Sequence, residues 1–239
     1  VAPDGLNINE DCGATAPDAM AQTVREASAQ IGIGLDGDAD RLVLSDETGG
    51  IFNGDYILAA LALDMQANGL LRGPVVGTVM SNLGLELLLA EKGIAFERAA
   101  VGDRYVLERM KTTGSNLGGE PSGHILLPHL TRSGDGLIAA LQILGVMCRT
   151  GKTASELLNQ FVPVPQKLVN LPDIDKSVLK EASIIQTVAA VEAELGNNGR
   201  VILRPSGTEP LIRVMVEALD EPALDKAMEK LVTAIESYR

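Results

Sequence analysis

The sequence contains no tryptophan, and aromatic residues make up only 3% of its 239 residues. A hydrophobic core must therefore be built from aliphatic side chains, and few rings are present to stack on nucleic-acid bases. Basic residues are also few, since 20 Lys and Arg stand against 32 Asp and Glu, giving a net charge of −12. This balance argues against nucleic acid or an anionic membrane as a partner. A bound phosphate would have to be met by local arginines or by a metal ion.

Cysteine is scarce as well. Cys12 and Cys148 lie far apart without a Cys-x-x-Cys spacing, so a reduced, cytoplasmic chain is expected. No apolar run approaches the roughly 18 residues of a membrane span. The start, residues 1–5, has neither the basic nor the apolar region of a signal peptide and lacks an initiator methionine. We expect a processed or truncated chain.

The most distinctive stretch present is the loop Asp36-Gly37-Asp38-Ala39-Asp40-Arg41. Its three carboxylates alternate, so in an extended or turning backbone they converge on one side and repel one another. A hard divalent cation such as magnesium or calcium would neutralise them, and Gly37 allows a tight turn. Arg41 adds a planar cation suited to a bidentate grip on phosphate. The loop predicts a magnesium site that also meets a phosphate.

Two other interpretations of this loop stay open. The three aspartates with Glu47 at the twelfth position fit a calcium EF-hand in part, but its sixth position should be glycine and is Arg41. The flanking segments 31–35 and 42–44 also have the pattern of strands rather than helices. The second alternative is a solvated acidic turn, because turns between strands are often rich in Asp and Gly.

A second polar loop, Arg204-Pro205-Ser206-Gly207-Thr208-Glu209-Pro210, lies between two expected strands, and Arg213 follows it. Inward-turned backbone amides, hydroxyl groups and guanidinium groups are what a phosphate dianion needs. The loop predicts a phosphate site, although an ordinary Gly/Pro hairpin turn uses the same residue types.

A third loop, Glu120-Pro121-Ser122-Gly123-His124, offers a carboxylate, a hydroxyl and an imidazole within five residues. A carboxylate and a hydroxyl can hold vicinal sugar hydroxyls, and a histidine can shuttle a proton. Local packing of His124, with Glu120 facing solvent, is the alternative.

Further polar residues have open roles. Arg104 is expected either in the same cleft or in a surface ion pair with Asp103. Asp135 either lies at a helix start that favours anions or simply caps that helix. His129 has no partner pattern and is expected at the surface.

Strands are expected to alternate with helices from residue 31 to about 112, which favours an α/β layer with a mostly parallel sheet. The stretch Val162-Pro163-Val164-Pro165 interrupts this pattern, so a domain boundary is expected between about 160 and 170. The remainder predicts a compact α+β module. Its last helix carries an apolar stripe of Leu224, Ala227, Met228, Leu231 and Ile235.

With these three loops in view, the sequence resembles the α-D-phosphohexomutase superfamily. Residues 36–41 match its metal loop, 119–124 its sugar loop and 204–210 its phosphate loop. Three motifs in family order, over nearly the whole chain, make the match specific. Within the superfamily the sequence is most similar to the bacterial phosphoglucosamine mutase branch. That similarity is carried by segments 3–9, 11–15, 101–106 and 133–136.

The resemblance implies mixed α/β sheet layers of phosphohexomutase type followed by a smaller α+β C-terminal domain. On this map residues 1–48 are the end of the family's second domain with the metal loop. Residues 49–163 are the third domain with the sugar loop, and residues 164–239 are the fourth with the phosphate loop. The family's phosphorylated catalytic serine belongs to the first domain, and none of Ser81, Ser122 and Ser206 lies in such a loop. We therefore expect this chain alone to be inactive.

The resemblance also implies an activity. Bacterial enzymes of this branch interconvert glucosamine 6-phosphate and glucosamine 1-phosphate through a phosphoserine enzyme and a 1,6-bisphosphate. The product serves the synthesis of UDP-N-acetylglucosamine and of cell-wall (peptidoglycan) precursors. A hexosamine phosphate substrate and a magnesium cofactor are implied, nucleic acid and membrane are not, and a homodimer of the full-length enzyme stays open.

Residues that match the family's functional positions fall into four groups. They are Asp36, Asp38 and Asp40 for magnesium; Arg41 and His124 for the transferring phosphoryl group and a proton; Glu120 and Ser122 for the sugar hydroxyls; and Arg204, Ser206, Gly207, Thr208 and Arg213 for the non-reacting phosphate.

Three other functions stay open. A phosphoglucomutase or phosphomannomutase of the same superfamily would differ in substrate preference. A stand-alone sugar-phosphate or metal binding module would perform no transfer chemistry. A magnesium-dependent phosphatase of another fold, with Asp36 as nucleophile, would leave the sugar and phosphate loops unexplained.

Overall fold

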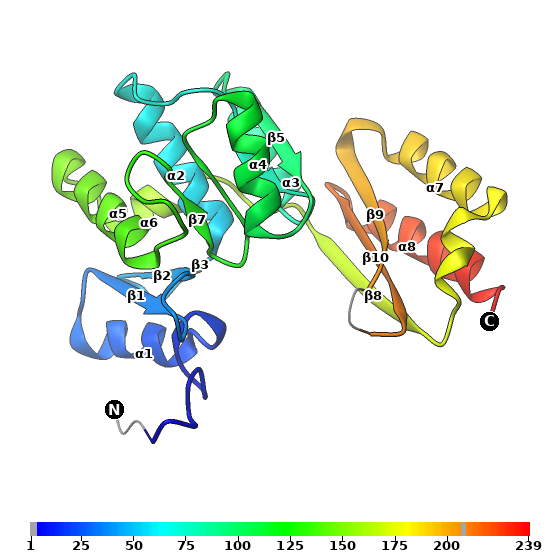
Figure 1. Ribbon diagram of the computed structural model, residues 1–239, viewed down its shortest axis with the longest axis horizontal. Helices are drawn as coiled ribbons and strands as arrows, with labels where there is room; N and C mark the ends of the chain where they lie inside the picture. Colours follow the sequence, from blue (N-terminus) through cyan, green and yellow to red (C-terminus); the bar gives the residue numbers. More distant parts are fainter. Residues whose placement is uncertain (1–3, 207–208) are drawn as a thin grey trace. The chain divides into compact units, whose positions relative to one another are not determined.

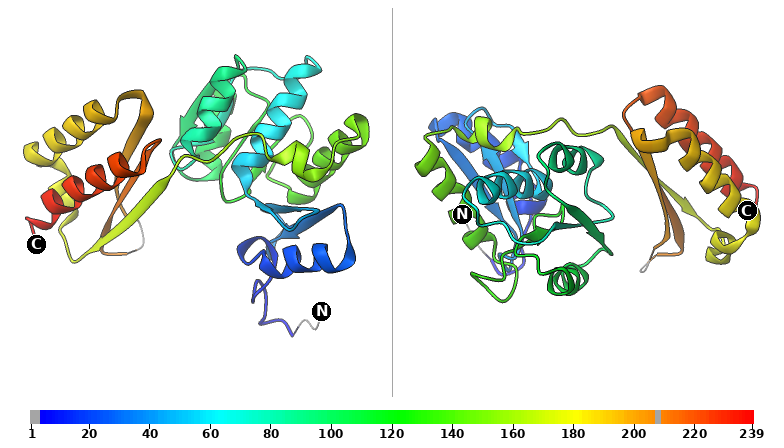
Figure 2. Two further views of the ribbon diagram at one scale, coloured as in Figure 1. Left: turned by 180° about the vertical axis from the view of Figure 1, so that it is seen from behind. Right: turned by 90° about the horizontal axis from the view of Figure 1, so that it is seen from above.

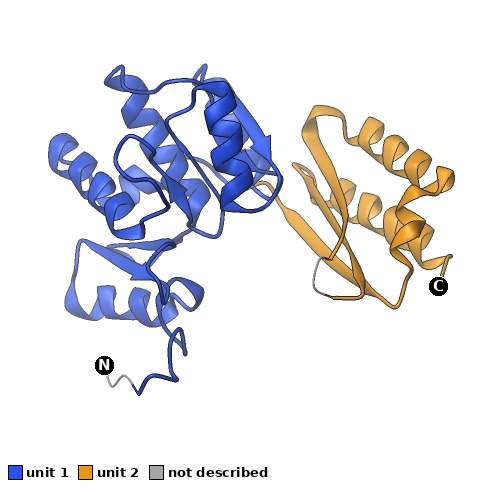
Figure 3. Ribbon diagram, viewed as in Figure 1, with its two compact units in different colours: residues 1–162 blue, residues 163–239 orange. Residues whose placement is uncertain are grey.

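The computed structural model describes residues 4–206 and 209–239. The chain divides into two compact units, Val1–Val162 and Pro163–Arg239 (Figure 3). The finer division into 1–48, 49–163 and 164–239 stays a prediction. Within the described ranges, no helix is both long and apolar enough to cross a membrane.

The first unit begins with a small antiparallel sheet in the order β1-β2-β3 (Figure 1). Its elements are the 3-10 turn η1 (Gly13–Thr15), α1 (Asp18–Ala27), β1 (Ile31–Leu35), β2 (Leu42–Asp46) and β3 (Ile51–Phe52). The expectation of a mostly parallel sheet is wrong here. The links between these strands are too short for the crossover that parallel strands require. The acidic loop is therefore a hairpin connection, with Leu35 opposite Leu42.

The rest of the first unit is a three-layer α/β/α arrangement whose sheet has the order β5-β4-β6-β7. Strand β4 is parallel to β5 and β6, whereas β7 is antiparallel to β6. Its elements are α2 (Gly54–Ala67), β4 (Val75–Thr78), α3 (Leu83–Glu91), β5 (Phe96–Ala99), α4 (Asp103–Thr113), β6 (Gly118–Gly119) and β7 (Ile125–Leu126). Val75 and Val76 are both fully buried but belong to different apolar clusters, because successive side chains of a strand point to opposite faces.

Two more helices, α5 (Gly136–Thr150) and α6 (Ala154–Leu158), complete the first unit. Leu42 and Leu44 of β2 are fully buried in the same apolar cluster as α2, α5 and α6. The small sheet and the α/β/α layers therefore share one core. Side-chain caps define where the helices begin: Asn53 caps α2, and Thr153 forms a capping box at α6.

The second unit is a three-stranded antiparallel sheet in the order β8-β10-β9 with two helices on one face (Figure 2). Its elements are β8 (Gln166–Pro172), η2 (Lys176–Lys180), α7 (Ala182–Leu195), η3 (Gly196–Asn198), β9 (Gly199–Pro205), β10 (Leu211–Ala218) and α8 (Glu221–Glu236). The apolar stripe expected on the last helix is buried throughout against this sheet and α7. A smaller α+β unit was expected here, and the fold confirms it.

One carboxylate ties the turn after β2 to the start of α6. Glu47 accepts a hydrogen bond from the backbone N–H of Ser155 at 3.1 Å and another from its hydroxyl group. Desolvation by burial raises the pKa of Glu47, but the hydrogen bonds from Ser155 outweigh it, so the pKa lies below its usual value. The ionised form is therefore the one that the fold stabilises.

We expect Glu47→Gln to destabilise the first unit by about 1 kcal/mol near neutral pH, the scale of a partly exposed hydrogen bond to a charged group. Because the folded-state pKa is depressed, this stabilisation is present above the unfolded value of 4.5 and is lost as pH falls through the folded pKa. Urea unfolding at neutral and acidic pH measures the effect, with Glu108→Gln, an exposed residue of α4, as control. A wild-type-to-variant difference that does not shrink in acid would contradict it.

Candidate functional site

The acidic loop and the Glu120–His124 loop lie side by side because their backbones are bonded to each other. The N–H of Leu42 donates to the carbonyl oxygen of Gly123 at 3.0 Å, and Arg41 faces His124 in an antiparallel bridge. Gly123 has φ of +93°, and a Cβ there would lie 2.1 Å from the carbonyl oxygen of Leu42. Only glycine permits this approach.

Backbone hydrogen bonds anchor these two loops to the first residues of two helices. The N–H of Gly54, at the start of α2, donates to the carbonyl oxygen of Pro121 at 3.2 Å. The N–H of Gly136, at the start of α5, donates to the carbonyl oxygen of Ala39 at 2.9 Å. Asp135 caps α5 by accepting from the N–H of Ile138 at 2.9 Å, which settles its role as a cap. Each loop is thus anchored to a helix N-terminus.

Asp36, Asp38 and Asp40 converge as the sequence predicts. Each offers a carboxylate oxygen, and these oxygens all lie within 4.8 Å of one another. Burial raises the pKa of Asp40 above its usual value, the charge of His124 opposes this, and Asp36 and Asp38 raise it further. An all-oxygen set of three carboxylates is the donor chemistry that a hard divalent cation prefers, so these residues fit a magnesium ion.

Two basic side chains border the acidic cluster. The Nε atom of Arg41 lies 3.6 Å from Asp36 Oδ2 and 3.9 Å from Asp40 Oδ1, with 47% of the side chain exposed. The Nδ1 atom of His124 lies 3.1 Å from Asp40 Oδ2. His124 is buried, its Nε2 atom has no partner among the described residues, and a Cβ on Gly134 would lie 2.2 Å from that atom. The imidazole is therefore wedged in place with one nitrogen on Asp40.

A pocket of about 430 Å³ opens in front of the two loops. Its walls include Asp40, Arg41, Glu120, Ser122 and His124, so the structure brings these predicted residues of the first unit together. Ser122 is exposed, whereas the Oε1 atom of Glu120 accepts a hydrogen bond from the N–H of Gly102 at 2.9 Å. Glu120 is thereby aimed by the segment that follows β5.

The pocket also contains residues to which sequence reasoning gave no binding role. Thr78 is the last residue of strand β4 and Met80 follows it, whereas Gly102 and Asp103 follow β5. The available signal was their position, because ligands of open α/β sheets bind at the carboxyl ends of parallel strands. Arg104 is not among the pocket residues; it lies over the ring of Tyr105, at 4.8 Å from its centroid.

The polar loop of the second unit concentrates positive charge. Arg204 and Arg213 are direct cross-strand partners in the β9–β10 register. Arg213 pairs with Glu209 at 2.8 Å, but its buried Nε atom has no partner among the described residues. Like charges opposite each other destabilise a sheet unless an anion lies between them.

Lys176 of η2 is a further cation at this loop that sequence reasoning missed. Its Nζ atom donates to the carbonyl oxygen of the buried Ser206 at 2.6 Å, from a position 30 residues away. Nothing in the local sequence signals this contact. Gly207 and Thr208, both expected to bind phosphate, lie outside the described residues.

Comparison with protein families agrees with this fold. The model described as phosphoglucomutase/phosphomannomutase, alpha/beta/alpha domain III matches residues 53–164, and the model of the C-terminal domain of the same family matches residues 157–234. The chain belongs to the phosphoglucomutase/phosphomannomutase family of phosphohexomutases. Its layered architecture is that of solved members.

Individual relatives with high sequence identity carry a more specific name than the family model does. The phosphoglucosamine mutase of Caulobacter vibrioides (strain NA1000 / CB15N) is 53% identical over 98% of this chain and 52% of its own length. The phosphoglucosamine mutase of Methylococcus capsulatus is 52% identical over 98% of this chain and 53% of its own length. The chain thus spans about half the length of the curated relatives it matches.

Two solved structures share the fold at lower identity. Aspergillus fumigatus N-acetylphosphoglucosamine mutase in complex with GlcNAc-6P and magnesium has a TM-score of 0.75 at 19% identity, covering 97% of this chain and 54% of that one. A phosphoglucomutase/phosphomannomutase family protein from Burkholderia thailandensis has a TM-score of 0.76 at 22% identity, covering 94% and 50%.

The close approach at Gly123 yields a prediction with a matched control. Gly123→Ala and Gly114→Ala both place a Cβ at positive φ, but the Cβ at Gly114 meets nothing within 4 Å. Both variants lose stability because an alanine is strained in the left-handed backbone conformation, whereas only the Gly123 variant must also push the two loops apart. We expect it to lose about 1–3 kcal/mol beyond the Gly114 variant in urea unfolding. Equal losses would mean that the loops are not held this tightly.

Proposed function

We propose that this chain is the metal-, sugar- and phosphate-binding part of a phosphoglucosamine mutase, which interconverts glucosamine 6-phosphate and glucosamine 1-phosphate. The observation that carries the proposal is that the acidic loop and the Glu120–His124 loop line one pocket. The identity of about half to relatives with this name supports the amino-sugar branch. The family model names glucose and mannose phosphates, so phosphoglucomutase or phosphomannomutase activity is the second candidate.

In this proposal Asp36, Asp38 and Asp40 hold magnesium. The bound ion supplies positive charge that stabilises a transferring phosphoryl group. Arg41 approaches the same phosphoryl group from the rim of the pocket, where its side chain is half exposed and needs only to turn from the carboxylates. The contact of His124 with Asp40 supports a positioning role for this histidine, and a role in proton handling stays a prediction.

Glu120 and Ser122 are proposed to bind the sugar hydroxyls. Their pocket is open and polar, and Glu120 is already oriented by the N–H of Gly102. Because a carboxylate and a hydroxyl can accept either pair of vicinal hydroxyls, the same loop can serve the sugar in both orientations that a mutase requires.

Arg204, Ser206 and Arg213 are proposed to bind the non-reacting phosphate, together with Gly207 and Thr208. The opposed arginines and the unpartnered Nε atom of Arg213 support an anion site.

Several further properties stay predictions: the phosphoserine, the 1,6-bisphosphate intermediate, cell-wall precursor synthesis, the inactivity of this chain alone, a cytoplasmic location and a homodimer. They concern a whole enzyme, because the curated relatives are about twice as long as this chain.

Calorimetric titration of the chain with glucosamine 6-phosphate, glucose 6-phosphate and inorganic phosphate, with and without magnesium, tests the proposed function. We expect the amino sugar to bind best, and Arg204→Ala to cost about 1.5–3 kcal/mol, the scale of a hydrogen bond to a charged group. Lys226→Ala, which removes one exposed charge from α8, should leave binding unchanged. Equal affinity for all three anions would contradict the amino-sugar assignment.

A separate prediction concerns how His124 holds Asp40. His124→Asn keeps a donor at the place of Nδ1, whereas His124→Gln puts its amide near Nε2 instead. We expect manganese binding, followed by electron paramagnetic resonance, to weaken about 10–100-fold in the glutamine variant and much less in the asparagine variant. If both variants bind manganese as wild type does, His124 does not position this carboxylate.

A further inference from the structure

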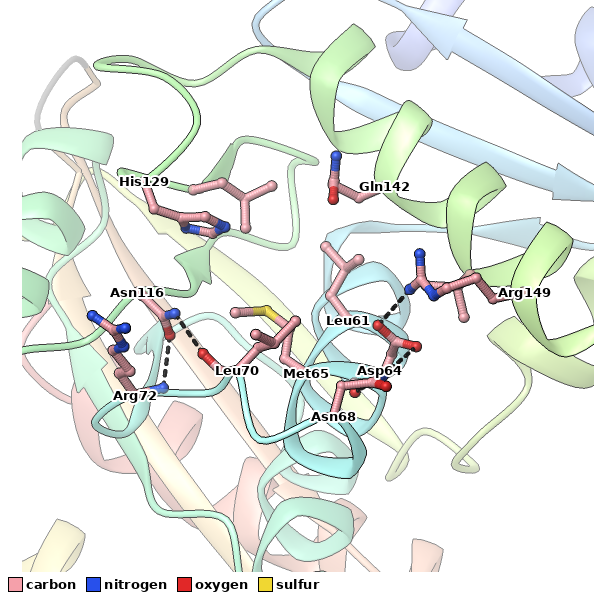
Figure 4. A pocket seen from close by; sticks show the side chains of 12 residues that line it. Leu61, Asp64, Met65, Asn68, Leu70, Arg72, Asn116, His129, Gln142 and Arg149 are labelled. Atoms are coloured by element: carbon pink, nitrogen blue, oxygen red, sulfur yellow. Dashed lines mark hydrogen bonds and ion pairs between the residues drawn. The ribbon is translucent and has the colours of Figure 1, made fainter.

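A second pocket of the first unit is larger than the one in front of the polar loops. This pocket of about 640 Å³ lies between the C-terminal halves of α2 and α5 (Figure 4). It shares no lining residue with the candidate active-site pocket. Its volume falls in the range of small-molecule sites. The family-derived functional positions leave this pocket without a role.

One wall of this pocket carries an arginine that is rigidly mounted but unpaired. The N–H of Arg72 donates to Asn116 Oδ1 at 2.9 Å, and the N–H of Asn116 donates back to the carbonyl oxygen of Arg72 at 3.1 Å. The Nδ2 atom of Asn116 also binds the carbonyl oxygen of Leu70 at 2.9 Å. One asparagine side chain thus fixes the segment, although no described residue pairs with the guanidinium group of Arg72.

The charge balance of the pocket differs from that of the chain. Arg149 pairs with Asp64 at 2.8 Å, which leaves Arg72 as the uncompensated charge. His129 lines the same pocket and is drawn on the Arg72 side of it in Figure 4, and its exposed ring makes no side-chain hydrogen bond to the described residues. Although the chain has a net charge of −12, the unpaired Arg72 gives this pocket a local positive charge that would attract an anion.

The floor of the pocket is apolar. Four buried apolar side chains line it: Leu61 and Met65 of α2, Val146 of α5, and Leu127, which follows β7. Figure 4 shows the Met65 side chain between Arg72 on one side and Arg149 on the other. Inorganic phosphate alone would leave this surface in contact with water, so an occupant that gains from it must carry an apolar body.

We propose that this pocket binds a small organic anion, with its phosphate or carboxylate head group on Arg72 and its apolar body against Met65. The guanidinium fork provides two parallel donors for such a head group, and the imidazole of His129 can add a third. The clamp formed by Asn116 pre-organises the site, so little ordering is required on binding. This inference does not depend on the proposed mutase activity.

The seven methionines of the chain allow a direct test. In a chain labelled with ¹³C at the methionine methyl groups, Met65 reports on this pocket and Met80 on the candidate active-site pocket. Met65→Leu and Met80→Leu assign the two signals. We expect phenyl phosphate to shift the Met65 signal saturably, and inorganic phosphate and phenol each to bind more weakly. A shift confined to Met80 would overturn the proposal without touching the proposed function.

Substitutions at charged residues test whether the positive charge of Arg72 contributes to binding. Arg72→Gln keeps the backbone bonds to Asn116 but removes the cation, and we expect it to weaken phenyl phosphate binding at Met65 roughly tenfold or more. Lys111→Gln, which removes one exposed charge from α4, should leave the affinity unchanged. Unaltered binding in the Arg72 variant, or phenol binding as tightly as phenyl phosphate, would overturn the anion assignment. Equal affinity for inorganic phosphate would overturn the role of the apolar floor.

Discussion

Repulsion among Asp36, Asp38 and Asp40 is the constraint on which the first unit depends. Oxygens of three carboxylates within 4.8 Å of one another favour any backbone that spreads them apart. The hairpin between β1 and β2 cannot spread, because both strands are bonded in register and Leu42 is buried in the core. The guanidinium group of Arg41 neutralises part of the charge, and the imidazole of His124 contacts Asp40. The core thus maintains a charge cluster that a cation would relieve.

Two helices transmit the rigidity of that core to the pocket. The first residues of α2 and α5 hold the Glu120–His124 loop and the acidic loop through their backbone N–H groups. The C-terminal halves of the same two helices form the floor of the second pocket. Glycine at the first helical position of each, Gly54 and Gly136, permits backbone contact that a Cβ would prevent. These two pockets therefore share their supporting elements.

Sequence reasoning found the parts of the site that are local in the chain. The loops at 36–41 and 120–124 can be recognised in the sequence because charged and turn-forming residues cluster within a few positions. Parallel pairing was wrongly expected for β1 to β3, since strand alternation alone does not reveal the short connections. The contact of His124 with Asp40 joins residues far apart in sequence, and Asn116 reaches Arg72 across 44 positions. No local pattern encodes such pairs, because they arise only when the layers pack.

The loop of the second unit mirrors the acidic loop with the opposite sign. Arg204 and Arg213 stand opposite each other on paired strands, although cross-strand pairs of like charge are costly. A sheet that only had to fold would place an acidic residue at one of these positions, as β9 and β10 do where Arg200 meets Glu217. The contrast lies within a single pair of strands. At the end far from the loop Arg200 faces an acidic partner, whereas beside the loop Arg204 faces another arginine, which is the distribution expected where a bound anion completes the structure.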